Sequence, residues 1–116
     1  MTRKKWIKKL DSLWGQIIHK GSRCEFCGKQ GNYNAHHLKR RSCLSTRFYL
    51  PNGVLLCIGC HFKIHASNID SYALIDKLKL TRGEEWWVEL EQRSNRIVKW
   101  GVRDFEEIFN KLNEEL

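Results

Sequence analysis

Residues 57–65 read Cys-Ile-Gly-Cys-His-Phe-Lys-Ile-His, and this stretch decides the fold because it carries two kinds of metal ligand at two spacings. Cys57 and Cys60 are separated as in a zinc knuckle, in which two thiolates bind one ion. His61 and His65 are four residues apart, so on a helix their imidazoles project from the same face. We therefore expect a helix from Cys60 onward that presents two histidines side by side.

Ligands of both kinds also occur earlier in the chain. Cys24 and Cys27 form another Cys-x-x-Cys pair, and Gly28 directly after it lets the backbone turn tightly around a bound ion. The two pairs can close a tetrahedral four-thiolate site, which is complete as a structural zinc site without further ligands. The adjacent His36 and His37 therefore need a separate role.

Three imidazoles are available for a second ion: His61, His65 and one of the pair His36-His37. Successive strand residues point to opposite sides, so the pair cannot easily face the same ion. Three protein ligands with an open position are typical of a catalytic metal site, and the remaining histidine is free to move protons. The alternative is one zinc site with mixed Cys and His ligands and idle surface histidines.

Apolar periodicity and turn signals predict the elements around these ligands. Ser67-Asn-Ile-Asp70 and Thr81-Arg-Gly-Glu84 resemble capping boxes that open helices. Trp86, Trp87 and Trp100 could stack on bases, but their helical spacing favours packing. The expected elements are an amphipathic helix over 2–19, strands over 33–38 and 54–57 joined by a long loop, a helix from 60, and helices over 67–80, 84–96 and about 105–112.

The charge is distributed unevenly. The chain carries a net charge of +8, but residues 1–65 contain 13 Lys and Arg against 2 Asp and Glu, whereas residues 66–116 contain 8 against 11. This asymmetry favours a polyanionic partner, with nucleic acid as the leading candidate, over a basic face kept for solubility. Four cations of the long loop are the candidate phosphate contacts: Lys39, Arg40, Arg41 and Arg47.

Composition also bounds the cellular setting. There is no apolar run approaching the roughly 20 residues needed to span a bilayer, and the N-terminus lacks the apolar core of a signal peptide. Two Cys-x-x-Cys pairs and the odd Cys43 suit zinc in a reducing cytosol better than a disulfide framework. We therefore expect a cytoplasmic protein with no membrane partner.

The stretch from Cys24 to His65 resembles the HNH, or ββα-metal, nuclease family. The spacing of 15 residues from His37 to Asn52 and 9 from Asn52 to His61 is similar to that of colicin DNases. The resemblance rests on an ordered set of residues: Cys24-x-x-Cys27, Ala35-His36-His37, Asn52, Leu55-Leu56-Cys57, Cys60-His61 and His65.

The resemblance implies a metal-dependent DNA endonuclease that leaves 5′-phosphate and 3′-hydroxyl ends. His37 aligns with the general base and Asn52 with the asparagine that holds the connecting loop. His36, His61 and His65 align with the ligands of the catalytic ion, for which Mg²⁺, Mn²⁺, Ni²⁺ and Zn²⁺ all remain candidates. One such site cuts one strand, so double-strand cleavage would require a homodimer.

The implied fold class is α+β: a small zinc-stapled ββα-metal core (β-hairpin plus helix), flanked by an N-terminal helix and two to three C-terminal helices. One domain is expected over residues 1–116, with a basic helix over 1–20, the core over 24–66 and a helical extension over 67–116.

A looser resemblance, which extends to about residue 91, is to NinG-type recombination proteins of lambdoid phages. It rests on scattered identities around the ligand motifs and on Asn68-Ile-Asp-Ser-Tyr72, Gly83-Glu84 and Leu90-Glu91. It suggests a phage or prophage protein that acts in DNA recombination or processing. The competing expectation is a non-catalytic, zinc-containing nucleic-acid-binding module with a degenerate histidine cluster.

Overall fold

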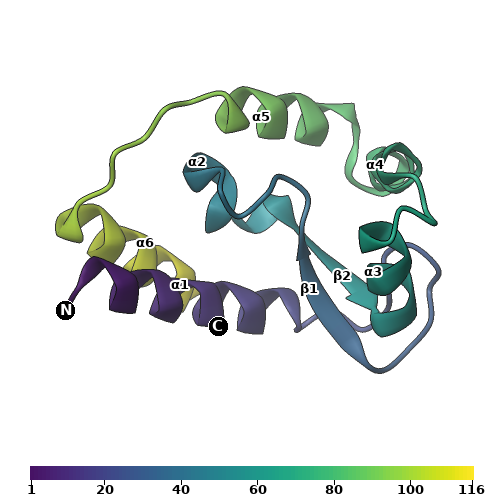
Figure 1. Cartoon of the computed structure of the whole chain (residues 1–116), viewed down its shortest axis with the longest axis horizontal. Coiled ribbons are helices and arrows are strands. Elements are labelled where there is room, and N and C mark those ends of the chain that lie inside the picture. Colours follow the sequence, from purple (N-terminus) through teal and green to yellow (C-terminus); the bar gives the residue numbers. More distant parts are fainter.

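The computed structural model describes all of residues 1–116 and has an α+β fold in which six helices surround one antiparallel hairpin (Figure 1). No helix is both long and apolar enough to cross a membrane. The elements in chain order are α1 (Arg3–Ile18), β1 (Tyr33–His37), α2 (Leu44–Arg47), the 3₁₀ turn η1 (Leu50–Asn52), β2 (Gly53–Cys57), α3 (Ile58–His65), α4 (Ser71–Arg82), α5 (Glu84–Ser94) and α6 (Val102–Glu114).

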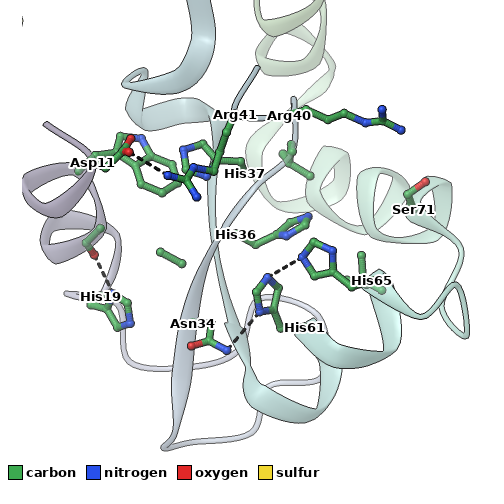
Figure 2. Close-up of a pocket in the computed structure, with 15 residues that line it drawn as sticks. Asp11, His19, Asn34, His36, His37, Arg40, Arg41, His61, His65 and Ser71 are labelled. Carbon is green, nitrogen blue, oxygen red and sulfur yellow. Dashed lines mark hydrogen bonds and ion pairs between the residues drawn. The ribbon is translucent and has the colours of Figure 1, made fainter. Parts of the chain in front are cut away.

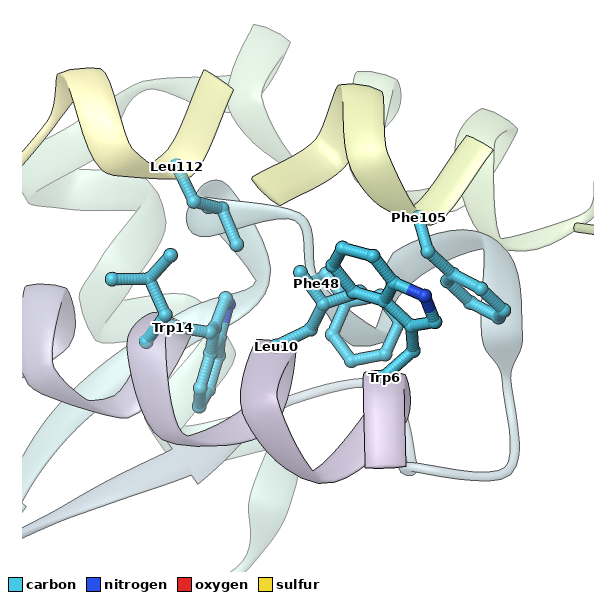
Figure 3. Packing of buried hydrophobic residues seen from close by; sticks show 7 residues of the cluster. Trp6, Leu10, Trp14, Phe48, Phe105 and Leu112 are labelled. Atoms are coloured by element: carbon cyan, nitrogen blue, oxygen red, sulfur yellow. The ribbon is translucent and has the colours of Figure 1, made fainter. Parts of the chain in front are cut away.

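Helix α1 confirms the amphipathic prediction and builds one of two hydrophobic clusters. The Thr2 side chain caps it by accepting from the Lys5 N–H at 3.2 Å. Its apolar stripe packs against α6, where the Trp6 ring stacks on Phe105 with 6.4 Å between centroids (Figure 3). The buried members of this cluster are Trp6, Leu10, Leu13, Trp14, Phe48, Phe105 and Leu112.

The predicted hairpin is present, with Tyr33 opposite Cys57 and His37 opposite Gly53. All five residues of β2 are buried, which explains their continuous apolar character. A β-carbon on Gly53 would lie 2.2 Å from Ile18 Cδ1 and 2.8 Å from Trp14 Cζ2. The absence of a side chain therefore lets α1 pack directly on the start of β2.

The second hydrophobic cluster joins the cysteines to β2 and α4. Its buried members are Cys24, Val54, Leu56, Cys57, Cys60, Leu74 and Leu78. Helix α3 lies against the hairpin and α4 follows it, while α5 spans the opposite side of the molecule from α1 (Figure 1). This arrangement places the histidine-bearing helix directly beside the histidine-bearing strand.

Of the two helices predicted from capping boxes, α4 begins at Ser71, later than expected, whereas α5 begins at Glu84 as expected. Ser67 has a positive φ of 61°, outside the extended conformation of an N-cap, and Asp70 caps α4 instead by accepting from the Tyr72 N–H at 2.9 Å. Thr81 lies inside α4, and Gly83 precedes α5. Helix α3 begins at Ile58 because the Cys57 side chain caps it.

The connection between the strands, expected as a turn-rich loop, contains the short helix α2 and the turn η1. The tryptophans contribute to packing as expected: Trp86 Nε1 donates to the Pro51 carbonyl at 2.8 Å, and Trp100 stacks on Phe48 at 5.9 Å. The leftover Cys43 donates to the Ser94 carbonyl, which ties this connection to the end of α5.

Candidate metal centres

Four cysteines converge at the junction of the 24–28 turn, β2 and α3. Their sulfur atoms all lie within 4.8 Å of one another, and Sγ of Cys27 is 3.8 Å from Sγ of Cys57. Four thiolates at about 2.3 Å from a tetrahedral zinc ion would be separated by about 3.8 Å. The cluster therefore fits a metal such as zinc. Gly28 follows with a φ of +79°, the conformation expected for the knuckle.

Proton binding within this cluster is uneven. Burial acts to raise the pKa of the Cys24 thiol, but backbone N–H groups of Cys27, Cys57 and Phe26 outweigh it and lower the pKa to about 6. Burial and the neighbouring thiols raise the pKa of Cys60 above its ordinary value. The Cys24 thiol therefore loses its proton more readily than the Cys60 thiol. A bound divalent ion would stabilise all four cysteines as thiolates.

The second group of ligands consists of His36, His61 and His65, which the structure brings together as the sequence predicted. Their ligand nitrogens lie within 4.8 Å of one another, and Nε2 of His61 is 3.0 Å from Nε2 of His65 (Figure 2). His36 comes from β1, whereas the other two come from successive turns of α3. Three imidazoles at this separation suit a divalent transition metal.

One partner of this group was missed at the sequence level. Nδ2 of the Asn34 amide donates to Nδ1 of His61 at 3.1 Å, which fixes the plane of the ring with Nε2 facing His65 (Figure 2). Residues 34 and 36 share one face of a strand, and that alternation was the available signal. Burial, together with the charges of the neighbouring imidazoles, lowers the pKa of His36 to about 4. His36 is therefore neutral, the form in which imidazole binds metals.

His37 points to the other face of β1, as strand alternation requires. Its ring stacks on Trp14 of α1, with 3.9 Å between centroids and a 12° interplanar angle. Nε2 lies 3.0 Å from the Arg47 carbonyl oxygen, so Nε2 carries the proton and Nδ1 keeps a free lone pair. Burial lowers the pKa of His37, and the hydrogen bond to Arg47 opposes that shift only in part.

The carbonyl that orients His37 is held in turn by α1. Arg47 donates through Nε and Nη2 to the carboxylate of Asp11, at 3.0 and 2.7 Å. Arg41 donates to the same carboxylate at 3.0 Å. Burial acts to raise the pKa of Asp11, but these two guanidinium groups outweigh it and lower the pKa. The signal for this role was that Asp11 is the single acidic residue among residues 1–24.

Asn52 is fully buried and fixes the connection between the strands. Its Oδ1 accepts from the Lys39 N–H at 2.7 Å, and its Nδ2 donates to the carbonyl oxygens of Lys39 and Thr46, both at 3.1 Å. These contacts match the loop-holding role that the resemblance implies. They use both polar atoms of the Asn52 side chain, so Asn52 fixes the backbone of this connection.

The four loop cations differ in availability. Arg41 and Arg47 pair with Asp11, and Lys39 pairs with Glu91 at 3.2 Å. Arg40 has no ion pair, and it lines the same cavity as His36, His37, His61 and His65 (Figure 2). This cavity has a volume of about 900 Å³. It is large enough for a phosphodiester group and its flanking sugars.

A scan against protein-family models, a search of curated proteins and a search of solved structures returned no match to this chain.

Proposed function

We propose that this protein is a metal-dependent HNH-type DNA endonuclease that hydrolyses phosphodiester bonds, with a ββα-metal core stapled by a structural zinc. The observation that carries the proposal is that the adjacent residues His36 and His37 have different surroundings. His36 joins His61 and His65 on one side of β1, whereas His37 keeps an unpaired Nδ1 in the same cavity. A purely structural site has no need for that free imidazole.

In this proposal His37 is the general base. Its Nδ1 accepts a proton from water as the water oxygen forms a bond to phosphorus and the bond from phosphorus to the 3′ oxygen breaks. The Arg47 carbonyl holds the required tautomer, Trp14 stacks on the ring and fixes its plane, and burial lowers the pKa of His37, which favours the neutral ring. The neutral His37 imidazole is thus held in a fixed orientation and can accept a proton directly.

A divalent ion bound by His36, His61 and His65 would stabilise the negative charge on the phosphate and on the leaving 3′ oxygen. Binding of that ion through Nε2 of His61 would place the proton on Nδ1, and the Asn34 amide, turned to present Oδ1, would accept from it and fix the ring. Arg40 at the rim of the cavity is the loop cation best placed to contact an adjacent phosphate.

The resemblance to NinG-type proteins supports a role in phage DNA recombination or processing. The experiment that tests the proposal compares supercoiled plasmid, linear duplex and four-way junction DNA as substrates, each with Mg²⁺, Mn²⁺, Ni²⁺ or Zn²⁺. Cleavage by wild type with at least one ion, and its loss in His65→Ala, is the expected result. Binding of DNA without cleavage under every condition would instead indicate the non-catalytic module.

The number of metal ions bound per chain provides a second test of the two sites. Wild type should bind one tightly held zinc and a second, exchangeable ion. His65→Ala should lose only the exchangeable ion, whereas the control Cys43→Ser should retain both, because Cys43 lies outside both ligand groups. A single ion per chain in wild type, with all ions present in excess, would contradict the second site.

A further inference from the structure

One face of α1 carries exposed cations that lead into the histidine cavity. Lys4, Lys8, Asp11 and Gly15 follow one another at steps of four, three and four residues, so they form one stripe along the helix. Asp11 and Gly15 of α1 line the cavity, and Asp11 lies on the side opposite α3 (Figure 2). The lysines therefore extend the cavity wall outward along the surface.

These lysines are not neutralised within the protein. Lys4, Lys5 and Lys8 are exposed, and none of them forms an ion pair or a side-chain hydrogen bond. The first turn of α1 contains no acidic residue, so its cations lie at the end of the helix dipole that favours negative charge. This placement lowers the stability of the free helix, and an external polyanion would offset the cost.

Gly15 gives an independent indication of a close approach. Glycine in the middle of a helix is less stable than alanine, and this position is helical, with no positive φ to require glycine. A β-carbon there would meet no protein atom within 4 Å. The packing of this protein therefore does not explain the glycine, whereas a ligand backbone that passes close to the helix would.

We propose that the Lys4–Lys8–Gly15 stripe of α1 binds the phosphate backbone of duplex DNA beside the phosphate that occupies the histidine cavity. The proposal rests on the nuclease function stated above and names the surface that holds the substrate. Eleven residues of helix separate Lys4 from Gly15, about 16 Å at 1.5 Å per residue. This length spans about five base pairs at 3.4 Å each.

The test measures affinity for duplex DNA as a function of salt concentration, without divalent ions, so that cleavage does not contribute. The double variant Lys4→Gln/Lys8→Gln should lower the slope of log affinity against log salt by about 1.8, or 0.9 for each lost phosphate contact. The control Lys29→Gln/Lys111→Gln removes the same charge from the cysteine turn and from α6, and its slope should remain that of wild type. Equal slopes in the two double variants would overturn the proposal.

Gly15→Ala separates a binding role from a structural one. We expect its melting temperature to rise by about 2–4 °C, because alanine is the better helix former. Its affinity for DNA should nevertheless fall at least about fivefold, because the added methyl group occupies the contact surface. A more stable variant with unchanged affinity would contradict the close approach.

These outcomes are distinguishable from failure of the proposed function. If wild type cleaves DNA but the stripe variants bind like wild type, the nuclease assignment stands and the stripe is wrong. If wild type binds DNA through the stripe without cleaving it, the surface stands and the nuclease assignment is wrong.

Discussion

Replacement of Asn52 by alanine should destabilise the protein strongly, because this buried side chain replaces water for three backbone groups, one of them buried and two partly buried. It accepts from the Lys39 N–H and donates to the Lys39 and Thr46 carbonyls. A net value of about 0.5–1.5 kcal/mol per bond, and the cost of leaving buried partners unpaired, predict a loss of about 2–4 kcal/mol. The unfolding free energy of a domain this size is only about 5–15 kcal/mol.

The assay is urea unfolding followed by circular dichroism, with the free energy obtained by linear extrapolation. With a slope of about 1–3 kcal/mol per molar urea, the midpoint of Asn52→Ala should fall by at least about 1 M. Asn52→Asp should be no better than alanine, because a carboxylate keeps the acceptor for Lys39 but places negative charge against two carbonyl oxygens.

The matched control is Asn68→Ala. Asn68 is exposed and its side chain makes no hydrogen bond, so its replacement should change the unfolding free energy by about 0.5 kcal/mol at most. A loss under about 1 kcal/mol in Asn52→Ala, close to that of the control, would refute the reasoning. Partial rescue by Asn52→Asp would show that the Lys39 N–H alone accounts for the effect.

Three further predictions follow from the packing, the charges and the cysteine cluster. Gly53→Ala should cost about 1–3 kcal/mol in urea unfolding, because its β-carbon would overlap Ile18, and an unchanged midpoint would contradict that contact. The lowered pKa of Asp11 contributes stability that is present above its ordinary value of 3.8 and lost as pH falls through the folded value. Asp11→Asn should therefore lose less stability than wild type between pH 7 and pH 3, and parallel losses would refute this. Cys57→Ser should lose the tightly bound zinc and melt at lower temperature, as wild type should with a strong chelator, and zinc retained in this variant would exclude the four-thiolate site.

Local signals in the sequence predicted the ligands and the elements that carry them. The spacing of Cys57 and Cys60, and the strand alternation of His36 and His37, depend only on neighbouring residues and fixed backbone geometry. The predicted start of α4 near Ser67 was wrong, and Thr81 does not cap α5, because several residues at each place can serve as caps. Only the folded backbone, with Ser67 at positive φ, selects Asp70.

Long-range contacts could not be predicted. From the sequence, Arg41 and Arg47 were expected to be available for phosphate. In the structure both pair with Asp11 of α1, which lies 30 or more residues earlier in the chain. Lys39 pairs with Glu91 of α5, which is still more distant. Such pairs depend on how the helices pack around the hairpin, and that packing leaves Arg40 as the loop cation without an ion pair.

The most direct test of the central claim is the single-turnover rate of plasmid cleavage by His37→Ala. We predict a rate about 10²–10⁴-fold below wild type, with zinc content and DNA affinity unchanged, because the variant lacks only the oriented base. Cleavage within about fivefold of the wild-type rate would contradict the account. The histidine cavity would then have to act without His37 as its base.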